Sequence, residues 1–318
     1  MGARRSIRFF ARTAGGVVLA AGLAMGVAVP ASAAPLWPGG PDITLPPIPG
    51  ITAPAPGVPV PPVQVAPPAP VAPVAPPAPT RGPANFSAPS LNPSSGEVVG
   101  VAQPIIIRFA SGVGDRGVAE RAIDVTTSAG DIPGRFFWIS NSQVRWRPDA
   151  FWPANISVTV NAGDASSTFS VGDSIITTAD DNTKTITVTR NGEVVRTMPT
   201  SMGKVGHETP NGTYIIGDRF REMYMDSSTY GVPVDSEEGY RTYVEYATRM
   251  SNSGIFVHAA PWSVNSQGVE NVSHGCLNVS TEDAKWFFET AQKGDPVIVQ
   301  NTDGGVLNAL DGLGDWQL

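Results

Sequence analysis

The sequence predicts a mainly β protein, a β-sandwich followed by a second, mostly β domain with one clear helix. Short runs rich in Val, Ile, Thr and aromatic residues recur from residue 86 onward, and Gly, Pro, Asn and Asp clusters separate them. The strongest hairpin signal, Asn191-Gly192, lies between two such runs, because a type I′ turn needs positive φ at both central positions. Only residues 281–292 have a convincing helical pattern.

The first 33 residues have the pattern of an export signal. Four arginines lie in the first dozen residues, the apolar stretch 15–29 follows, and Ala31-Ser32-Ala33 fits a small-residue cleavage site. The apolar stretch is shorter than the ~20 residues that a membrane-spanning helix needs. We therefore expect residues 1–33 to be a signal peptide, and the mature protein to be exported to the periplasm or cell wall.

Residues 34–85 are predicted to be a Pro/Ala-rich linker rather than a folded domain. Of the 31 prolines, 19 fall between Pro35 and Pro83. Such a composition favours polyproline II, which makes a semi-rigid spacer. We expect a stalk that holds the folded part away from its point of attachment; a disordered tail without a role is the alternative.

Charge and cysteine content exclude some classes of protein. The chain has 21 Lys+Arg against 28 Asp+Glu, and without residues 1–33 the basic count falls to 17. Because such a surface repels phosphate, we expect no nucleic-acid partner. With one cysteine, the chain cannot form an internal disulfide.

Residues 86–171 are expected to form the sandwich. Trp138, Trp146 and Trp152 are candidates for its core, and no cluster of titratable residues suggests chemistry there. We expect a spacer or positioning module. Its predicted strands are 105–109, 123–125, 143–147 and 156–160.

Residues 172–301 are expected to form the second domain, with 302–318 as a tail. A strand at 254–258 ends on His258. Ser280 is the predicted N-cap of the helix, and Gly294 the residue that follows its end. The other predicted strands are 184–190, 193–198, 213–216 and 295–300.

Cys276 is the most informative residue of the sequence, because two of the three histidines, His258 and His274, lie near it. Three interpretations are open. Cys276 could be a small buried hydrophobe with structural histidines. It could join both histidines in a zinc site, although the spacing does not support one. It could be a thiolate nucleophile whose pKa a neighbouring imidazolium lowers below neutrality, with the N–H groups of Gly275 and Cys276 binding an oxyanion.

The segment from Ser273 to Asn278, reading SHGCLN, with His258 at this distance before it, resembles the signature of the L,D-transpeptidases, the YkuD-type catalytic domain. The resemblance covers about 130 residues, from near Asp173 to Asn301. The segments 225–233, 258–263 and 311–316 resemble the actinobacterial, mycobacterial-type enzymes, in which immunoglobulin-like domains precede the catalytic domain.

This resemblance implies a fold and an activity. The sandwich would be an immunoglobulin-like domain. The enzyme would be an acyltransferase that forms 3→3 cross-links between peptidoglycan stem peptides through a cysteine thioester and releases D-Ala. A tetrapeptide stem would be the donor and a diaminopimelate amine the acceptor, carbapenem-type β-lactams would be covalent inhibitors, and neither cofactor nor metal is implied.

The resemblance also implies roles for individual residues. Cys276 would be the nucleophile and His258 the general base, oriented by the backbone carbonyl of Ala259. His274 and Gly275 would surround the oxyanion hole together with Cys276. The implied substrate-binding and lid residues are Met225, Tyr240, Trp262, Ser273 and Asn278.

A cover over the site is expected between Arg219 and Ser253, where five of the six tyrosines lie. Acids in this segment could attract an amine, although simple solvation explains them equally well. Three other functions remain open at this stage. They are an L,D-carboxypeptidase that uses the same Cys-His pair, a wall-binding module without catalysis, and a zinc peptidase.

Overall fold

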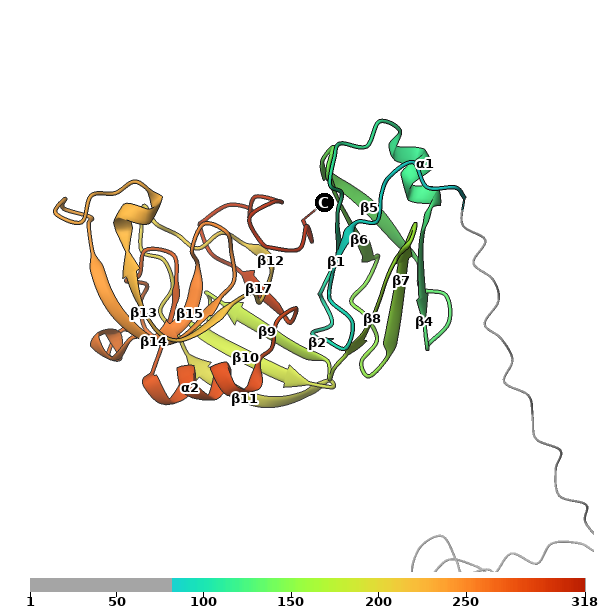
Figure 1. Ribbon diagram of the computed structural model, residues 1–318. Helices are drawn as coiled ribbons and strands as arrows, with labels where there is room; N and C mark the ends of the chain where they lie inside the picture. Colours follow the sequence, from blue (N-terminus) through green and yellow to red (C-terminus); the bar gives the residue numbers. More distant parts are fainter. Residues whose placement is uncertain (1–81, 318) are drawn as a thin grey trace, which may run out of the picture. The chain divides into compact units, whose positions relative to one another are not determined.

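The computed structural model describes residues 82–317. Strands dominate this part, which has two α-helices, so the mainly β prediction is confirmed (Figure 1). The predicted signal peptide and nearly all of the predicted linker lie outside the described residues. No described helix is both long and apolar enough to span a membrane.

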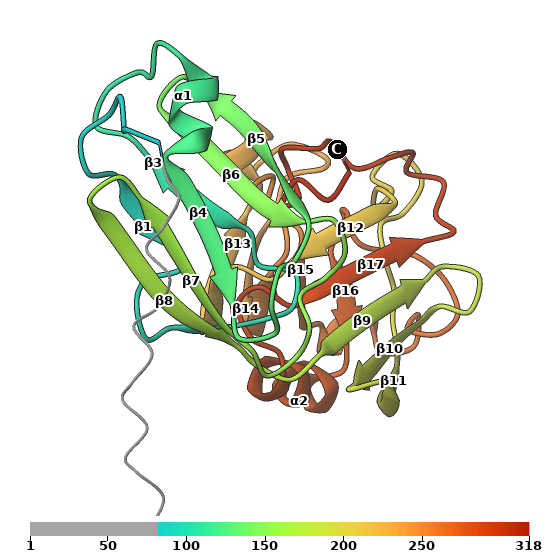
Figure 2. The same cartoon turned by 90° about the vertical axis from the view of Figure 1, so that its right-hand side faces the viewer.

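The first domain is a sandwich of two four-stranded sheets (Figure 2). One sheet has the order β1 (Ser90–Asn92), β3 (Ile105–Arg108), β6 (Gln143–Pro148) and β5 (Gly134–Ser140). The other has the order β2 (Val98–Val99), β8 (Ala165–Val171), β7 (Ser157–Ala162) and β4 (Ile123–Thr127). All four predicted strands are present, and β1, β2, β5 and β8 are additional.

The tryptophans of this domain occupy two different environments. Trp146 and Trp152 are buried in the core, with ring centroids 5.4 Å apart. Trp138 is only partly buried and donates a hydrogen bond to Glu120 over 2.7 Å. Glu120 belongs to α1 (Arg116–Arg121), a single short helix that the sequence pattern did not predict and that Asp115 caps. Its six residues are too few for a helical period to show.

The second domain packs two sheets and a helix around a second core. The first sheet has the order β11 (Glu193–Pro199), β10 (Thr185–Arg190), β9 (Ile175–Asp180), β17 (Pro296–Gln300) and β12 (Gly212–Ile215), as Figure 2 shows. The second has the order β13 (Arg219–Asp226), β14 (Arg241–Arg249), β15 (Phe256–Ala259) and β16 (Leu277–Val279). The helix α2 (Thr281–Thr290) packs on β14 and β15.

The predicted hairpin forms around Asn191 and Gly192, with φ values of 51° and 87°. The predicted tail is part of the second domain, because Leu307 is buried in its core. The end of α2 differs from the prediction. The helix ends at Thr290, and Ala291 is already extended, so Gly294 does not follow the last turn. Gly294 lies in the loop before β17 with φ of 90°.

Strand β14 pairs unequally with its two neighbours in the second sheet. It pairs along most of its length with β13, but only Thr248 and Arg249 pair with β15. The β13–β14 hairpin therefore extends beyond the rest of the sheet, and its connecting loop, residues 227–240, lies at the far end (Figure 1). A short 3₁₀ turn, η1 (Ser227–Tyr230), begins this loop.

The N-cap of α2 gives a direct test of the local folding argument. The Ser280 hydroxyl accepts the Asp283 N–H over 3.0 Å. Because Ser280→Ala leaves that N–H without its partner, it should lower the free energy of unfolding by about 1 kcal/mol, measured by urea denaturation. Ser280→Thr keeps the hydroxyl and serves as the control. Equal losses from both substitutions would contradict the assigned cap.

Candidate active site

Parallel pairing of β15 with β16 brings His258 and Cys276 to one face of the second sheet. Val257 pairs with Leu277 and His258 with Asn278. Because side chains alternate along a strand, Val257 and Leu277 enter the main core while His258 and Asn278 point to the opposite side. Cys276 immediately precedes β16 and lies on the same side as His258.

This side of the sheet forms the wall of a cavity of about 200 Å³. It is lined by every residue with a predicted catalytic or substrate-binding role, except Ala259 and Gly275. Thr242, Val244 and Val272 also line it and were not predicted, although Thr242 and Val244 show the period-two spacing of a strand face. The predicted residues on the wall are Met225, Tyr240, His258, Trp262, Ser273, His274, Cys276 and Asn278.

The His258 ring is held in one orientation. Its Nδ1 lies 2.9 Å from the backbone oxygen of Ala259, which is the contact that the resemblance implies. Nδ1 therefore carries the proton and donates, which leaves Nε2 as the basic nitrogen. His258 is 3% exposed, and this burial lowers its pKa to about 4. The ring is thus neutral at pH 7 and able to accept a proton.

The Cys276 thiol does not match the expected lowering of its pKa. The residue is 8% exposed and packs with Met225, Val244 and Phe256. Burial raises the pKa of the thiol to about 11. Its sulfur lies 3.8 Å from the Gly254 oxygen, and no hydrogen bond to the His258 ring is found among residues 82–317. The resting pair is therefore thiol and neutral imidazole, not thiolate and imidazolium.

Ser273 holds the turn that presents Cys276. Its Oγ donates to the Cys276 oxygen over 2.6 Å and accepts the Gly275 N–H over 3.0 Å. Gly275 has a φ of 114°, which L side chains rarely adopt, so glycine is needed for conformation rather than for space. The Gly275 N–H thus donates to Ser273 in this structure, and its expected role in binding an oxyanion stays a prediction. The Cys276 N–H has no acceptor among the described residues and remains available.

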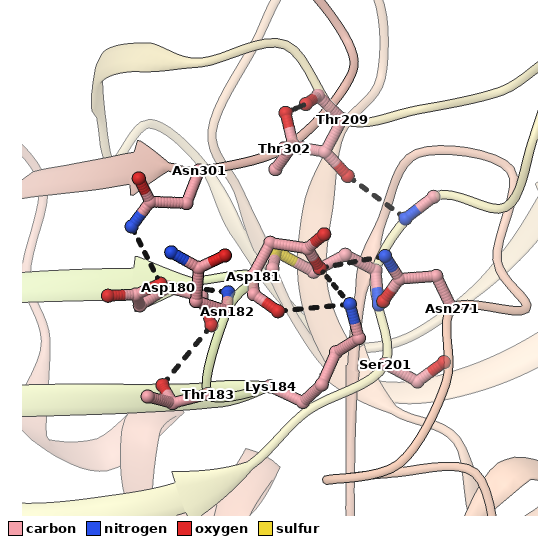
Figure 3. Close-up of polar contacts among 12 residues, drawn as sticks. Asp180, Asp181, Asn182, Thr183, Lys184, Ser201, Thr209, Asn271, Asn301 and Thr302 are labelled. Atoms are coloured by element: carbon pink, nitrogen blue, oxygen red, sulfur yellow. Dashed lines mark hydrogen bonds and ion pairs between the residues drawn. The ribbon is translucent and has the colours of Figure 1, made fainter.

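A polar network holds the segment that leads into this turn (Figure 3). Asn271 accepts the Met202 N–H over 3.0 Å and donates to Asp181 over 2.7 Å. Lys184 also donates to the Asp181 carboxylate, over 2.8 Å. Figure 3 shows both Asn271 and Lys184 directed at Asp181 from separate segments. This network ties the β9–β10 turn to the Cys276 loop, and no sequence motif indicates it because its members are far apart in the chain.

The loop at 227–240 covers part of the cavity through Tyr240. The Ser227 hydroxyl accepts the Tyr240 N–H over 2.9 Å, and the Ser227 N–H donates to the Tyr240 oxygen over 3.0 Å. These two bonds close the base of the loop. The Tyr240 ring lies 5.1 Å from the His274 ring. Trp262, which also lines the cavity, is 57% exposed, with its ring 6.1 Å from that of His258.

Glu238 is the acid through which this loop contacts the Cys276 turn. Its Oε2 lies 2.9 Å from Nζ of Lys204 and 2.8 Å from Nε2 of His274. The hydrogen bonds from Lys204 and His274 lower the pKa of Glu238 to about 2. His207 is the third partner, at 3.5 Å. The motif around Cys276 points to His274, whereas no sequence motif indicates a role for His207.

The sequence left open a zinc site made of His258, His274 and Cys276. The structure does not bring these three together as a group of metal ligands. Among the described residues, the side chains that gather as potential metal ligands are His207, Glu238 and His274. His258 and Cys276 line the adjoining cavity, as His274 does, but they do not belong to this group of ligands.

Comparison with known proteins places both domains. Residues 174–299 match the L,D-transpeptidase catalytic domain family, and residues 78–165 match the bacterial Ig domain family. L,D-transpeptidase 2 of Mycobacterium tuberculosis (strain CDC 1551 / Oshkosh) is 50% identical over 250 residues, which are 74% of this chain and 61% of that relative. L,D-transpeptidase 1 of M. tuberculosis (strain ATCC 25618 / H37Rv) is 44% identical over 210 residues, or 66% of this chain and 83% of that relative.

Solved structures show the same likeness. An LD transpeptidase in complex with imipenem superposes with a TM-score of 0.64 at 43% identity, covering 67% of this chain and 99% of that one. L,D-transpeptidase 3 of M. tuberculosis, in complex with a faropenem-derived adduct, gives a TM-score of 0.62 at 40% identity, with 67% and 98% covered.

The hydrogen bonds of Asn271 predict that Asn271→Ala destabilises the fold. The substitution leaves the Met202 N–H without its acceptor, and Met202 is fully buried. We expect the free energy of unfolding to fall by about 1–3 kcal/mol in urea denaturation. Asn182→Ala, at the same corner, is the control, because Asn182 is exposed and bonds Asp180 through its backbone N–H. A loss no larger than that of the control would contradict the network's role.

The raised pKa of Cys276 predicts slow alkylation near neutral pH. Since only the thiolate reacts and the thiolate fraction grows with pH up to the pKa, the iodoacetamide rate should rise about tenfold per pH unit from pH 7 to pH 10. Labelling is site-specific because Cys276 is the only cysteine. A free thiol peptide with an ordinary pKa gives the reference profile. A rate that levels off below pH 8 would show a thiolate at rest.

Proposed function

The chain belongs to the L,D-transpeptidase family, and from this premise we propose that it cross-links peptidoglycan stem peptides by acyl transfer through Cys276. The observation that carries the proposal is the single cavity that Cys276 and His258 share in the domain matching the family's catalytic domain. The donor is a tetrapeptide stem, the product is a 3→3 cross-link, and the leaving group is D-Ala.

Acylation begins from the neutral pair. The Cys276 thiol gives its proton to Nε2 of His258 as the sulfur attacks the carbonyl carbon of the third stem residue. The new S–C bond turns the carbonyl oxygen into an oxyanion. When the C–N bond breaks, the imidazolium returns the proton to the amine of D-Ala, which leaves. The hydrogen bond from Nδ1 of His258 to Ala259 keeps Nε2 directed for both transfers.

The oxyanion is stabilised first by the Cys276 N–H. One well-placed donor of this kind is worth about 3 kcal/mol in the barrier. A second donor is Gly275, once its N–H leaves the Ser273 hydroxyl. Bound substrate would draw the Gly275 N–H from the Ser273 hydroxyl to the oxyanion, since the developing oxyanion is a stronger acceptor than a hydroxyl.

The second half of the reaction replaces sulfur by nitrogen. The side-chain amine of an acceptor stem attacks the thioester, His258 takes a proton from that amine, and the C–S bond breaks to restore the thiol. Water competes for the same thioester. Tyr240 and Trp262, which both line the cavity, limit the space around Cys276 and favour an acceptor that binds there.

Location and inhibition belong to the same proposal. An enzyme acting on the wall must be exported, which agrees with the signal-like residues 1–33 and the proline-rich residues after them. A relative's structure contains imipenem and another a faropenem-derived adduct. We expect carbapenem-type β-lactams to acylate Cys276 of this chain through the same proton transfer to His258.

Purified disaccharide-tetrapeptide, analysed by mass spectrometry, tests the proposed function. The protein should convert it to a cross-linked dimer with loss of D-Ala, and Cys276→Ala should reduce turnover at least ~10⁴-fold because no other thiol is present. Circular dichroism should show the variant folded.

Three results would contradict the proposal. Turnover retained by Cys276→Ala would mean that Cys276 is not the nucleophile. Tripeptide without dimer, even with an added amine acceptor, would indicate the carboxypeptidase. Wall binding without any turnover would indicate a binding module.

A further inference from the structure

Three potential metal ligands meet where the 227–240 loop touches the Cys276 turn. Their ligand atoms all lie within 4.8 Å of one another. Oε2 of Glu238 is 2.8 Å from Nε2 of His274 and 3.5 Å from Nε2 of His207. A tetrahedral zinc ion bound at ~2.0–2.1 Å needs ligand atoms ~3.4 Å apart. The observed separations bracket this value, so small side-chain rotations are sufficient to bind an ion.

The two histidines stand on segments that are already fastened to each other. The Lys204 N–H donates to the Ser273 oxygen over 2.9 Å, and the Thr209 hydroxyl donates to the Gly275 oxygen over 2.8 Å. The His207 N–H donates to the Lys204 oxygen over 2.9 Å. As a result the two imidazole rings are held 4.6 Å apart without help from an ion. A pair of preorganised imidazoles lowers the cost of binding.

We propose that His207, His274 and Glu238 form a binding site for one divalent transition-metal ion, with zinc as the best-matched ion. Two imidazoles and one carboxylate, with water in the fourth position, are an established ligand set for zinc. Both histidines are part-exposed and the carboxylate is about half-exposed, so an ion reaches the site from solvent. His274 also lines the active-site cavity, but metal binding at this site does not depend on the acyl-transfer chemistry.

Lys204 competes with the ion for the carboxylate of Glu238. Its Nζ lies 2.9 Å from the same Glu238 oxygen that would face the metal. Its positive charge repels a divalent cation, and its ammonium must leave that oxygen or move to the other one. Lys204 thus weakens binding and keeps the site responsive to the ion concentration, whereas removing its charge should strengthen binding.

Metal binding would join the covering loop to the active-site turn. Glu238 comes two residues before Tyr240, which lines the cavity, and His274 comes two residues before Cys276. An ion bound by Glu238 and both histidines fixes the loop against the turn more strongly than the present hydrogen bonds. The expected consequence is reduced access of reagents and substrates to Cys276.

Isothermal titration calorimetry with zinc chloride at pH 7.5 tests the site. The full chain carrying Cys276→Ala is the reference, since it cannot bind zinc through sulfur. We expect one zinc ion per chain. His207→Asn and Glu238→Gln, each in that background, should weaken binding at least ~10-fold. Lys204→Met should tighten it, and Glu237→Gln, beside the site, should leave it unchanged.

Several outcomes would overturn the site. These are no zinc binding by the reference, equal affinity in His207→Asn and Glu238→Gln, or equal weakening by Glu237→Gln. Unchanged or weaker affinity in Lys204→Met would contradict the competition. Circular dichroism of each variant separates loss of a ligand from loss of the fold.

Access to Cys276 gives a second readout that does not depend on turnover. Zinc should slow iodoacetamide labelling of the otherwise unchanged chain, and a chelator should restore the rate. His207→Asn should remove most of this protection. Equal protection in that variant would mean that zinc binds the thiol itself, and the proposed site would be wrong.

Discussion

The parallel pairing of β15 with β16 is the constraint on which the rest of the site depends. It places alternate residues on opposite faces of the sheet. Val257 and Leu277 lie in the main core, and His258 and Asn278 face the cavity. A slip of one residue would bury the polar set and expose the apolar one. The main core therefore fixes the register, and the register places Cys276 on the same cavity wall as His258.

Burial then sets the chemistry of the pair. The same apolar surroundings that raise the pKa of the Cys276 thiol lower that of His258, so both groups are uncharged at rest. A neutral imidazole is the form that accepts a proton, and a thiol of raised pKa gives one up only as its sulfur forms a bond. Reactivity is thereby coupled to the presence of an acyl donor. This replaces the ion pair that the sequence suggested, and it protects an unpaired thiol from stray oxidation.

The sequence was informative where local patterns decide structure. Asn191-Gly192 predicted its hairpin, and Ser280 predicted the start of α2. The family resemblance predicted eight of the residues that line the cavity, but not Thr242, Val244 or Val272. Patterns failed where tertiary contacts decide. Strand β8 has small polar residues and little β signal, and Gly294 resembled a helix end because the extended backbone at Ala291 could not be foreseen. The Asp181–Asn271 bond joins residues 90 positions apart, and no local pattern records it.

The protonation state of the buried pair separates this account from an ion-pair mechanism most directly. Nitrogen-15 NMR of the His258 ring in the substrate-free protein reports both its charge and its tautomer. We expect a neutral ring, protonated on Nδ1, from pH 8 down to about pH 5, with charging only as the pH approaches about 4. An imidazolium at pH 7 that disappears in Cys276→Ala would contradict it, because the thiol would then already be ionised at rest.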